Sequence, residues 1–166
     1  RGKIQIMAKK TKVKKTLVEQ ILTKSGVSHK GIQINALEGE LPSGYARNHI
    51  FKTLALLGDK TGPVIGIVPI TEHLSEKKLA KISGNKKVAM IPQKDLEKTT
   101  GYIHGANNPV GIRQKHNYPI FIDETALELE KLIVSAGEVG YSIIIAPKDL
   151  ANFVKASFVD ILEEIN

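Results

Sequence analysis

Hydrophobic and polar positions along this chain repeat with two periods, one typical of helices and one typical of strands. Apolar residues at helical spacing around Leu17 and Leu22 predict a first helix, which Ser25-Gly26 would end. Two apolar runs, at 50–57 and 64–70, flank the turn formers of 58–62 and predict a β-hairpin. This hairpin is the strongest local signal in the sequence.

The other periodic segments are short. Helices are predicted at 93–98, after Pro147, and at 74–82, where Ser75 is a plausible N-cap and Gly84 follows the end. Strands are predicted at 31–34, 87–91, 118–122, 132–134 and 141–146, with a closing element at 154–165. The dense turn formers of 99–111 predict a loop. Because strands outnumber helices and include a hairpin, we expect an α+β fold with a mixed or mostly antiparallel sheet.

Lys52 interrupts the hydrophobic pattern of the first hairpin strand. On a period of two it shares a face with Ile50, Leu54 and Leu56. An ammonium group among apolar side chains is costly to bury unless its charge is paired or used. Two interpretations remain open at this point. Either the face is half covered and the amine reaches solvent along its stem, or Lys52 is a functional residue.

Length and composition predict one domain that is large enough for a hydrophobic core. The 166 residues include no cysteine, which excludes disulfides, thiolate metal sites and thiol nucleophiles. The five histidines lack zinc-site spacing, and no P-loop, dinucleotide-binding or G-x-S-x-G motif occurs. The longest apolar runs are far too short to span a membrane, and no signal peptide is evident. We therefore expect a cytoplasmic protein with no metal, no cofactor and no membrane partner.

The formal net charge of +7 is concentrated at the N-terminus. Residues 1–15 contain seven basic residues and no acidic residue, so the rest of the chain is formally neutral. We interpret residues 1–12 as a basic tail and residues 13–166 as the folded domain. The tail is either a solvated leader or an arm that contacts the phosphates of a nucleic acid. Residues 1–6 precede Met7 and are either native or a remnant of expression.

Two glycine-rich loops complete the candidate chemistry. The first contains Gly101, Gly105 and Gly111, and the second contains Gly137 and Gly140. Glycine lets a backbone approach a ligand closely and point its N–H groups at a carbonyl or phosphate, but it is also common in ordinary turns. If the chain is an enzyme, the lack of other chemistry predicts that it works by holding a substrate and stabilising charge.

In this order, the segments resemble the YbaK/EbsC family of aminoacyl-tRNA deacylases, which is related to the editing domain of bacterial prolyl-tRNA synthetases. The resemblance covers residues 12–162 and rests on FKTL (51–54), TGY (100–102) with Gly105 and PVG (109–111), VSAG (134–137) with Gly140, PKDL (147–150) and FVDI (158–161). It implies a single-domain α+β fold with a central mixed, barrel-like β-sheet surrounded by short helices.

The resemblance also implies roles for individual residues. Lys52 would be the catalytic lysine, which holds a substrate carbonyl or an oxygen of the terminal nucleotide. The implied substrate-binding residues, which receive the aminoacyl-adenosine end, are Thr53, Gly101, Tyr102, Gly105, Ser135 and Gly137. The chain departs from the family pattern at Ala106, Asn108, Glu138-Val139 and Ser142, the last at a position where aspartate is common. These departures bear on amino-acid specificity and on contacts with tRNA.

The implied function is trans-editing, the release of cysteine from mischarged tRNA(Pro). Correctly charged tRNA(Cys) is a second candidate substrate, and prolyl-tRNA synthetase is a candidate partner. In the implied mechanism the cysteinyl thiol attacks its own ester carbonyl and leaves as a cyclic thiolactone, so the protein needs no nucleophile of its own. The alternatives are hydrolysis of Ala-tRNA(Pro) by water and a non-catalytic binding or regulatory module.

Overall fold

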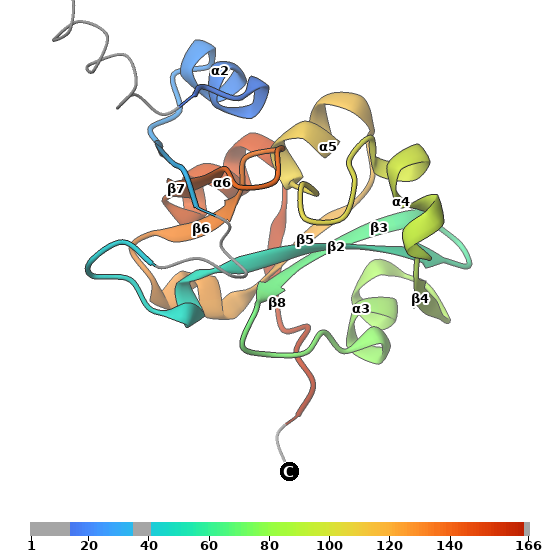
Figure 1. Ribbon diagram of the computed structural model, residues 1–166. Helices are drawn as coiled ribbons and strands as arrows, with labels where there is room; N and C mark the ends of the chain where they lie inside the picture. Colours follow the sequence, from blue (N-terminus) through green and yellow to red (C-terminus); the bar gives the residue numbers. More distant parts are fainter. Residues whose placement is uncertain (1–13, 35–40, 165–166) are drawn as a thin grey trace, which may run out of the picture.

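The computed structural model describes residues 14–34 and 41–164, and its strands form two sheets (Figure 1). The larger sheet has the order β4-β2-β3-β5-β8, with strands Val88–Met90, Phe51–Gly58, Gly62–Pro69, Ile120–Asp123 and Ser157–Val159. The smaller sheet has the order β1-β7-β6, with strands Lys30–Ile32, Ser142–Ile145 and Leu132–Ser135. A bridge between Ile50 and Ile133 joins the two sheets just before β2.

Strand pairing confirms the predicted hairpin and the predicted fold class. Strands β2 and β3 pair antiparallel along their whole length, from Phe51 opposite Pro69 to Gly58 opposite Gly62. Strand β5 runs parallel to both β3 and β8, so the larger sheet is mixed, whereas the smaller sheet is antiparallel. The α+β class with a central mixed sheet is therefore confirmed. Among the described residues the two sheets meet at one corner without closing.

Short helices surround the sheets. The α-helices of the described residues are α2 (Leu17–Lys24), α3 (Glu76–Ser83), α4 (Gln93–Thr100), α5 (Pro109–Lys115) and α6 (Pro147–Val154), and 3-10 turns occur at Arg47–His49 and Glu124–Glu128. In Figure 1, α3 lies on one side of the β2–β3 hairpin and the other α-helices lie on the opposite side. The predicted cap of α3 is confirmed, because the Ser75 side chain accepts a hydrogen bond from the Lys78 N–H and Gly84 ends the helix.

Helix α5 differs from the sequence-based expectation, which treated 99–111 as a loop. Asn108 caps this helix by accepting a hydrogen bond from the Gly111 N–H at 2.6 Å, and Pro109 occupies its first position. The pair of an N-cap asparagine and a following proline was the missed signal. Gly111 therefore lies inside a helix, where the absence of a Cβ leaves room for the ring of Tyr102.

Strand β2 contributes to hydrophobic clusters on both of its faces. Phe51 and Ala55 belong to the main core, which also includes buried residues of both sheets and of α2, α5 and α6. Leu56 belongs to a second cluster, which also contains Leu79 of α3. Within the described ranges, no helix is long and apolar enough to cross a membrane.

Candidate functional site

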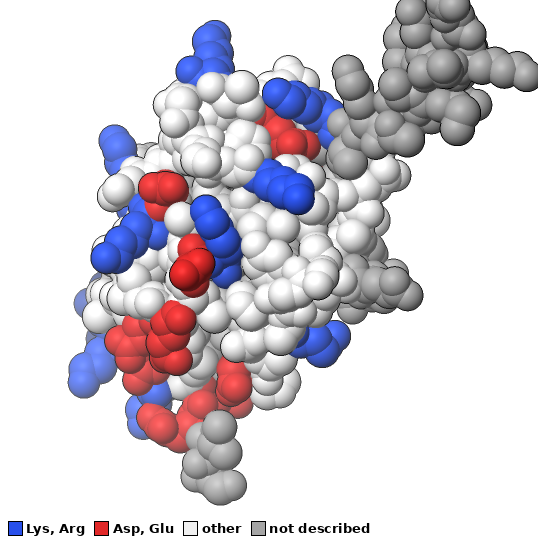
Figure 2. Space-filling model, turned by 90° about the vertical axis from the view of Figure 1, so that its left-hand side faces the viewer, with Lys and Arg blue, Asp and Glu red and all other residues white. Residues whose placement is uncertain are grey.

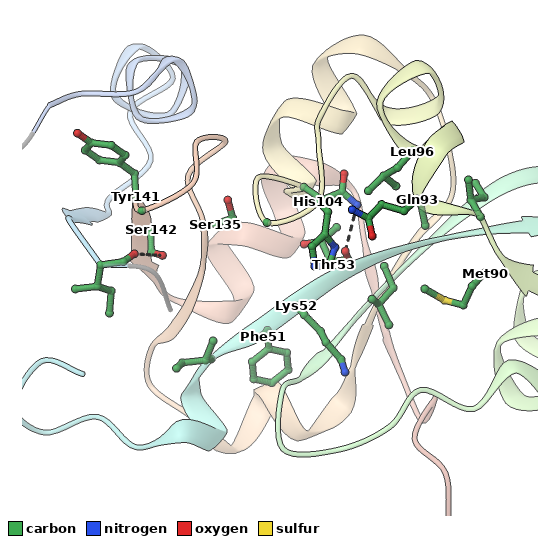
Figure 3. Close-up of a pocket in the computed structure, with 18 residues that line it drawn as sticks. Phe51, Lys52, Thr53, Met90, Gln93, Leu96, His104, Ser135, Tyr141 and Ser142 are labelled. Carbon is green, nitrogen blue, oxygen red and sulfur yellow. Dashed lines mark hydrogen bonds between the residues drawn. The ribbon is translucent and has the colours of Figure 1, made fainter. Parts of the chain in front are cut away.

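A cavity of about 330 Å³ opens along β2. Its walls come from β2, the segment from β4 to α4, the loop before α5, and the loop and strand that follow β6 (Figure 3). The wall combines apolar side chains such as Met90, Ile91 and Leu96 with polar residues from the two glycine-rich loops. A mostly apolar cavity of this size is typical of a small-molecule site.

The cavity lies against a free edge of β2. The Ile50 carbonyl accepts from the Ile70 N–H on the β3 side, whereas the Ala55 carbonyl accepts from the Ile91 N–H on the opposite side. Because backbone groups alternate in direction along an antiparallel strand, the N–H and carbonyl of Thr53 also point away from β3. The cavity contacts the six consecutive residues 50–55, as an edge site would. The Thr53 N–H can therefore donate to a ligand.

Lys52 lines this cavity with a partly buried side chain. It shares its side of β2 with Leu54 and Leu56, as predicted, although the opposite side is more fully buried. In Figure 3 the Lys52 amine and the Thr53 side chain point to opposite sides of the β2 ribbon. No ion pair to Lys52 is found within the described residues. Its positive charge is therefore available to a ligand.

Two consecutive asparagines hold the first glycine-rich loop against β2. Asn107 donates through Nδ2 to the Thr53 carbonyl at 3.2 Å, and Asn108 donates to the Ala106 carbonyl at 3.1 Å while it caps α5. Thr53 Oγ1 and Asn107 Oδ1 are buried and have no hydrogen-bond partner in the described part of the chain. Buried polar atoms without partners are uncommon, and both of these residues line the cavity.

The second glycine-rich loop forms a compact turn between β6 and β7. Ser135 Oγ accepts a hydrogen bond from the Gly137 N–H at 3.1 Å, and the φ angle of Gly137 is 92°, which favours glycine. The two loops touch each other at the cavity, since a Cβ placed on Gly105 would lie 3.4 Å from Val139. A larger residue at Gly105 would therefore press on the second loop.

The structure brings together four of the predicted site residues. Lys52, Thr53, Gly105 and Ser135 line the cavity, whereas Gly101, Tyr102 and Gly137 do not. The Tyr102 ring packs over Gly111, and the Lys115 amine lies 4.4 Å from the ring centroid. Gly101 ends α4 with a φ angle of 89°. The residues outside the lining therefore shape the loops that carry the lining residues.

Sequence reasoning missed several lining residues, including Gln93, His104, Asn107 and Tyr141. His104 had been weighed only as a zinc ligand. Asn107 lies inside the recognised loop motif. Its polar side chain, just before a helix that begins with a buried proline, was a signal for a functional role. The others come from elements that only tertiary structure brings next to β2.

The charge around the cavity is basic. Among the described residues its lining includes the charged Lys52 but no aspartate or glutamate, and the same residues contain no cluster of three side chains that could hold a metal. Figure 2 shows basic and acidic side chains interspersed on the face that it presents, with acidic side chains gathered toward the C-terminal end. No continuous basic surface covers the described part of that face.

The predicted basic tail, residues 1–12, lies outside the described residues. Lys14, the first described residue, forms an ion pair with Glu138 at 2.6 Å and lies 5.7 Å from the centroid of the Tyr141 ring. The hydrogen bond to Glu138 raises the pKa of the Lys14 amine. Because Gly140 and Tyr141 line the cavity, the chain enters the described domain beside the second glycine-rich loop.

Comparisons with known proteins agree with this geometry. A protein of Enterococcus faecalis, provisionally named Cys-tRNA(Pro)/Cys-tRNA(Cys) deacylase EbsC, is 38% identical over 162 residues, which cover 93% of this chain and 98% of that protein. A crystal structure provisionally described as a trans-editing enzyme for prolyl-tRNA synthetase shares the fold, with a TM-score of 0.73, 22% identity and coverage of 89% of this chain and 95% of that one.

A second solved structure, from work on epitope backbone grafting onto scaffold proteins, also has this fold. Its TM-score is 0.77 at 24% identity, and the match covers 89% of this chain and 96% of that chain. The profile of the aminoacyl-tRNA editing domain matches residues 42–153, a range that contains every lining residue of the cavity except Ile34. The chain therefore belongs to the aminoacyl-tRNA editing domain family.

Proposed function

We propose that this protein is a trans-editing deacylase that releases cysteine from mischarged Cys-tRNA(Pro), with Cys-tRNA(Cys) as a second substrate. The observation that carries the proposal is the cavity itself, in which the described residues offer an unpaired lysine and the Thr53 N–H but no carboxylate and no thiol. Such a site can hold an ester and stabilise negative charge, but it lacks an activated nucleophile. The printed name of the Enterococcus relative supports the same substrates.

In the proposed reaction the substrate supplies its own nucleophile. The cysteinyl sulfur attacks the ester carbonyl carbon, so that a C–S bond forms and the C–O bond to the terminal ribose breaks. The thiol proton leaves with the ribose oxygen, and water then opens the released thiolactone to free cysteine. The Lys52 ammonium group and the Thr53 N–H donate to the carbonyl oxygen as negative charge develops on it.

The apolar residues of the cavity wall favour a substrate whose amino-acid side chain is small and weakly polar. Met90, Ile91 and Leu96 form an apolar part of the wall, which suits a thiol better than a charged group. The rival reaction, hydrolysis of Ala-tRNA(Pro), needs an activated water. His104 is the imidazole side chain of the cavity lining and the candidate general base, so a strong dependence of the rate on His104 would favour that rival.

A substrate panel separates the possibilities. Purified protein is mixed in excess with tRNA(Pro) that carries labelled cysteine, serine or alanine, and release of the amino acid is followed over time. We expect rapid release of cysteine and far slower release of serine, because a hydroxyl has almost no anion at neutral pH. His104→Ala should retain cysteine release.

Each other result points to a different conclusion. Comparable release of serine and cysteine would indicate an activated water and refute the thiol mechanism. Preferred release of alanine would support the rival hydrolase. Binding of all three tRNAs without any release would support a non-catalytic module.

The remaining assignments complete the proposal. Residues 13–166 form the deacylase domain, residues 1–12 form a basic tail, and the protein acts in the cytoplasm. Prolyl-tRNA synthetase is the proposed partner, because the substrate is its mischarged product and because a solved structure of the same fold carries that description. Co-purification of the two proteins in the presence of tRNA(Pro) tests this association.

A further inference from the structure

We propose that Thr53 and Asn107 together bind a primary amino group of the substrate, and we assign this group to the α-amino group of the aminoacyl ester. The proposal rests on the proposed function, since it concerns the same cavity. It assigns to Asn107 a role as a substrate-binding residue.

Contact with the backbone determines the orientation of the Asn107 amide. The Thr53 carbonyl can only accept a hydrogen bond, so the Asn107 atom 3.2 Å from it is the amide nitrogen. Oδ1 is then the free atom of the amide, and it can only accept. Thr53 Oγ1 is also without a partner, and each of the two residues is only 8% exposed. Two unsatisfied oxygens therefore lie on residues that touch each other in the cavity wall.

The number of polar hydrogens selects the ligand group. A substrate group that donates to both oxygens needs at least two polar hydrogens, and this excludes the thiol and the ribose hydroxyl groups of the substrate, since each has one. A primary amino group has two or three. Among the described residues the lining contains no carboxylate and does contain Lys52, so these residues would hold the amino group by neutral acceptors rather than by an ion pair.

The short separation between the amino nitrogen and the carbonyl carbon of an aminoacyl ester favours the α-amino group. In the ester, the amino nitrogen and the carbonyl carbon are attached to the same carbon atom. Thr53 offers matching groups within one residue, because its N–H points toward the cavity and can hold the carbonyl oxygen while Oγ1 accepts from the amine. The exocyclic amino group of the adenine is the other primary amino group of the aminoacyl-adenosine, and the test must separate the two.

Thr53→Val is the informative variant. It keeps the shape of the side chain and removes only a hydroxyl that has no partner, so the protein should remain folded, with an unchanged or higher midpoint of thermal unfolding. Thr53→Ser, which retains the hydroxyl, is the matched control. Calorimetry would measure binding of three stable analogues. The first is an adenosine with cysteine joined by an amide at the 3′ position, and the second has 3-mercaptopropionate in place of cysteine, so it lacks the α-amino group. The third is the cysteinyl compound on a purine riboside, which lacks the exocyclic amino group.

We expect Thr53→Val to weaken binding of the cysteinyl adenosine about tenfold, and to leave binding of the mercaptopropionyl compound unchanged. The purine riboside compound should show the same tenfold loss, and Thr53→Ser should bind like the wild type. Equal losses for all three compounds, or no loss for any, would overturn the proposal. If the loss disappeared only with the purine riboside, the adenine amino group would be the one bound. If the wild type bound none of them, the proposed function itself would fail.

Discussion

Lys52→Met tests the chemistry of the cavity most directly, because it removes the ammonium group and keeps most of the aliphatic stem. The side chain is partly buried and forms no ion pair within the described residues, so the free energy of unfolding should change by no more than ~0.5 kcal/mol. The catalytic effect should be much larger. Loss of one preorganised donor to a developing oxyanion lowers a rate by about 10²–10³, which corresponds to roughly 3–4 kcal/mol of transition-state stabilisation.

The assay is release of labelled cysteine from Cys-tRNA(Pro) at saturating enzyme, so that weaker tRNA binding does not mimic a chemical defect. Lys77→Met, at an exposed lysine of α3 that does not line the cavity, is the matched control for the loss of one positive charge. It should react like the wild type. A folded Lys52→Met protein with a rate within a factor of a few of the wild type would refute the role of Lys52. Lys52→Arg should restore the rate only in part, because the planar guanidinium group does not have the geometry of the amine.

Two further predictions concern the tail and the support of the first glycine-rich loop. Deletion of residues 1–12 removes five basic residues. The plot of log affinity for tRNA against log salt concentration should therefore become flatter, while the rate at saturation stays the same. An unchanged slope would show that the tail does not contact phosphates. Gly111→Ala should lower the free energy of unfolding, measured in urea, by about 1–3 kcal/mol, because the new methyl group would overlap the Tyr102 ring. This loss is expected despite the better helix propensity of alanine. An unchanged or higher stability would show that Tyr102 does not pack there.

Local patterns in the sequence predicted most of the fold. The hairpin follows from two apolar runs around a glycine-bounded turn, and α3 follows from Ser75 and Gly84 at the two ends of a helical pattern. The placement of Lys52 on one side of β2 also follows from local alternation. Each of these features depends on residues that are close together in the chain, which is why periodicity and turn chemistry were enough.

The parts that could not be predicted depend on distant contacts. The hydrogen bond from Asn107 to Thr53 joins residues 54 positions apart, and no local sequence pattern predicts it. The cavity exists because β4 pairs with β2 only from Leu56 onward, with one further hydrogen bond to the Ala55 carbonyl, and this leaves the Thr53 N–H at the edge. Whether a loop residue lies in such a wall or behind it, as Tyr102 does, is likewise decided by packing rather than by the loop motif.

Ser142 contributes a neutral side chain to the cavity wall, and this affects both Lys52 and recognition of the substrate amine. It lines the cavity, and its hydroxyl donates to the Ile34 carbonyl at 3.3 Å. A carboxylate in this wall would attract the Lys52 ammonium group and compete with the ester oxygen for it. The described part of the wall holds none, so Lys52 is unpaired there and can respond to charge that develops during the reaction. The same lack of a carboxylate leaves recognition of the substrate amine to neutral oxygens, and Thr53 Oγ1 and Asn107 Oδ1 are the unsatisfied ones.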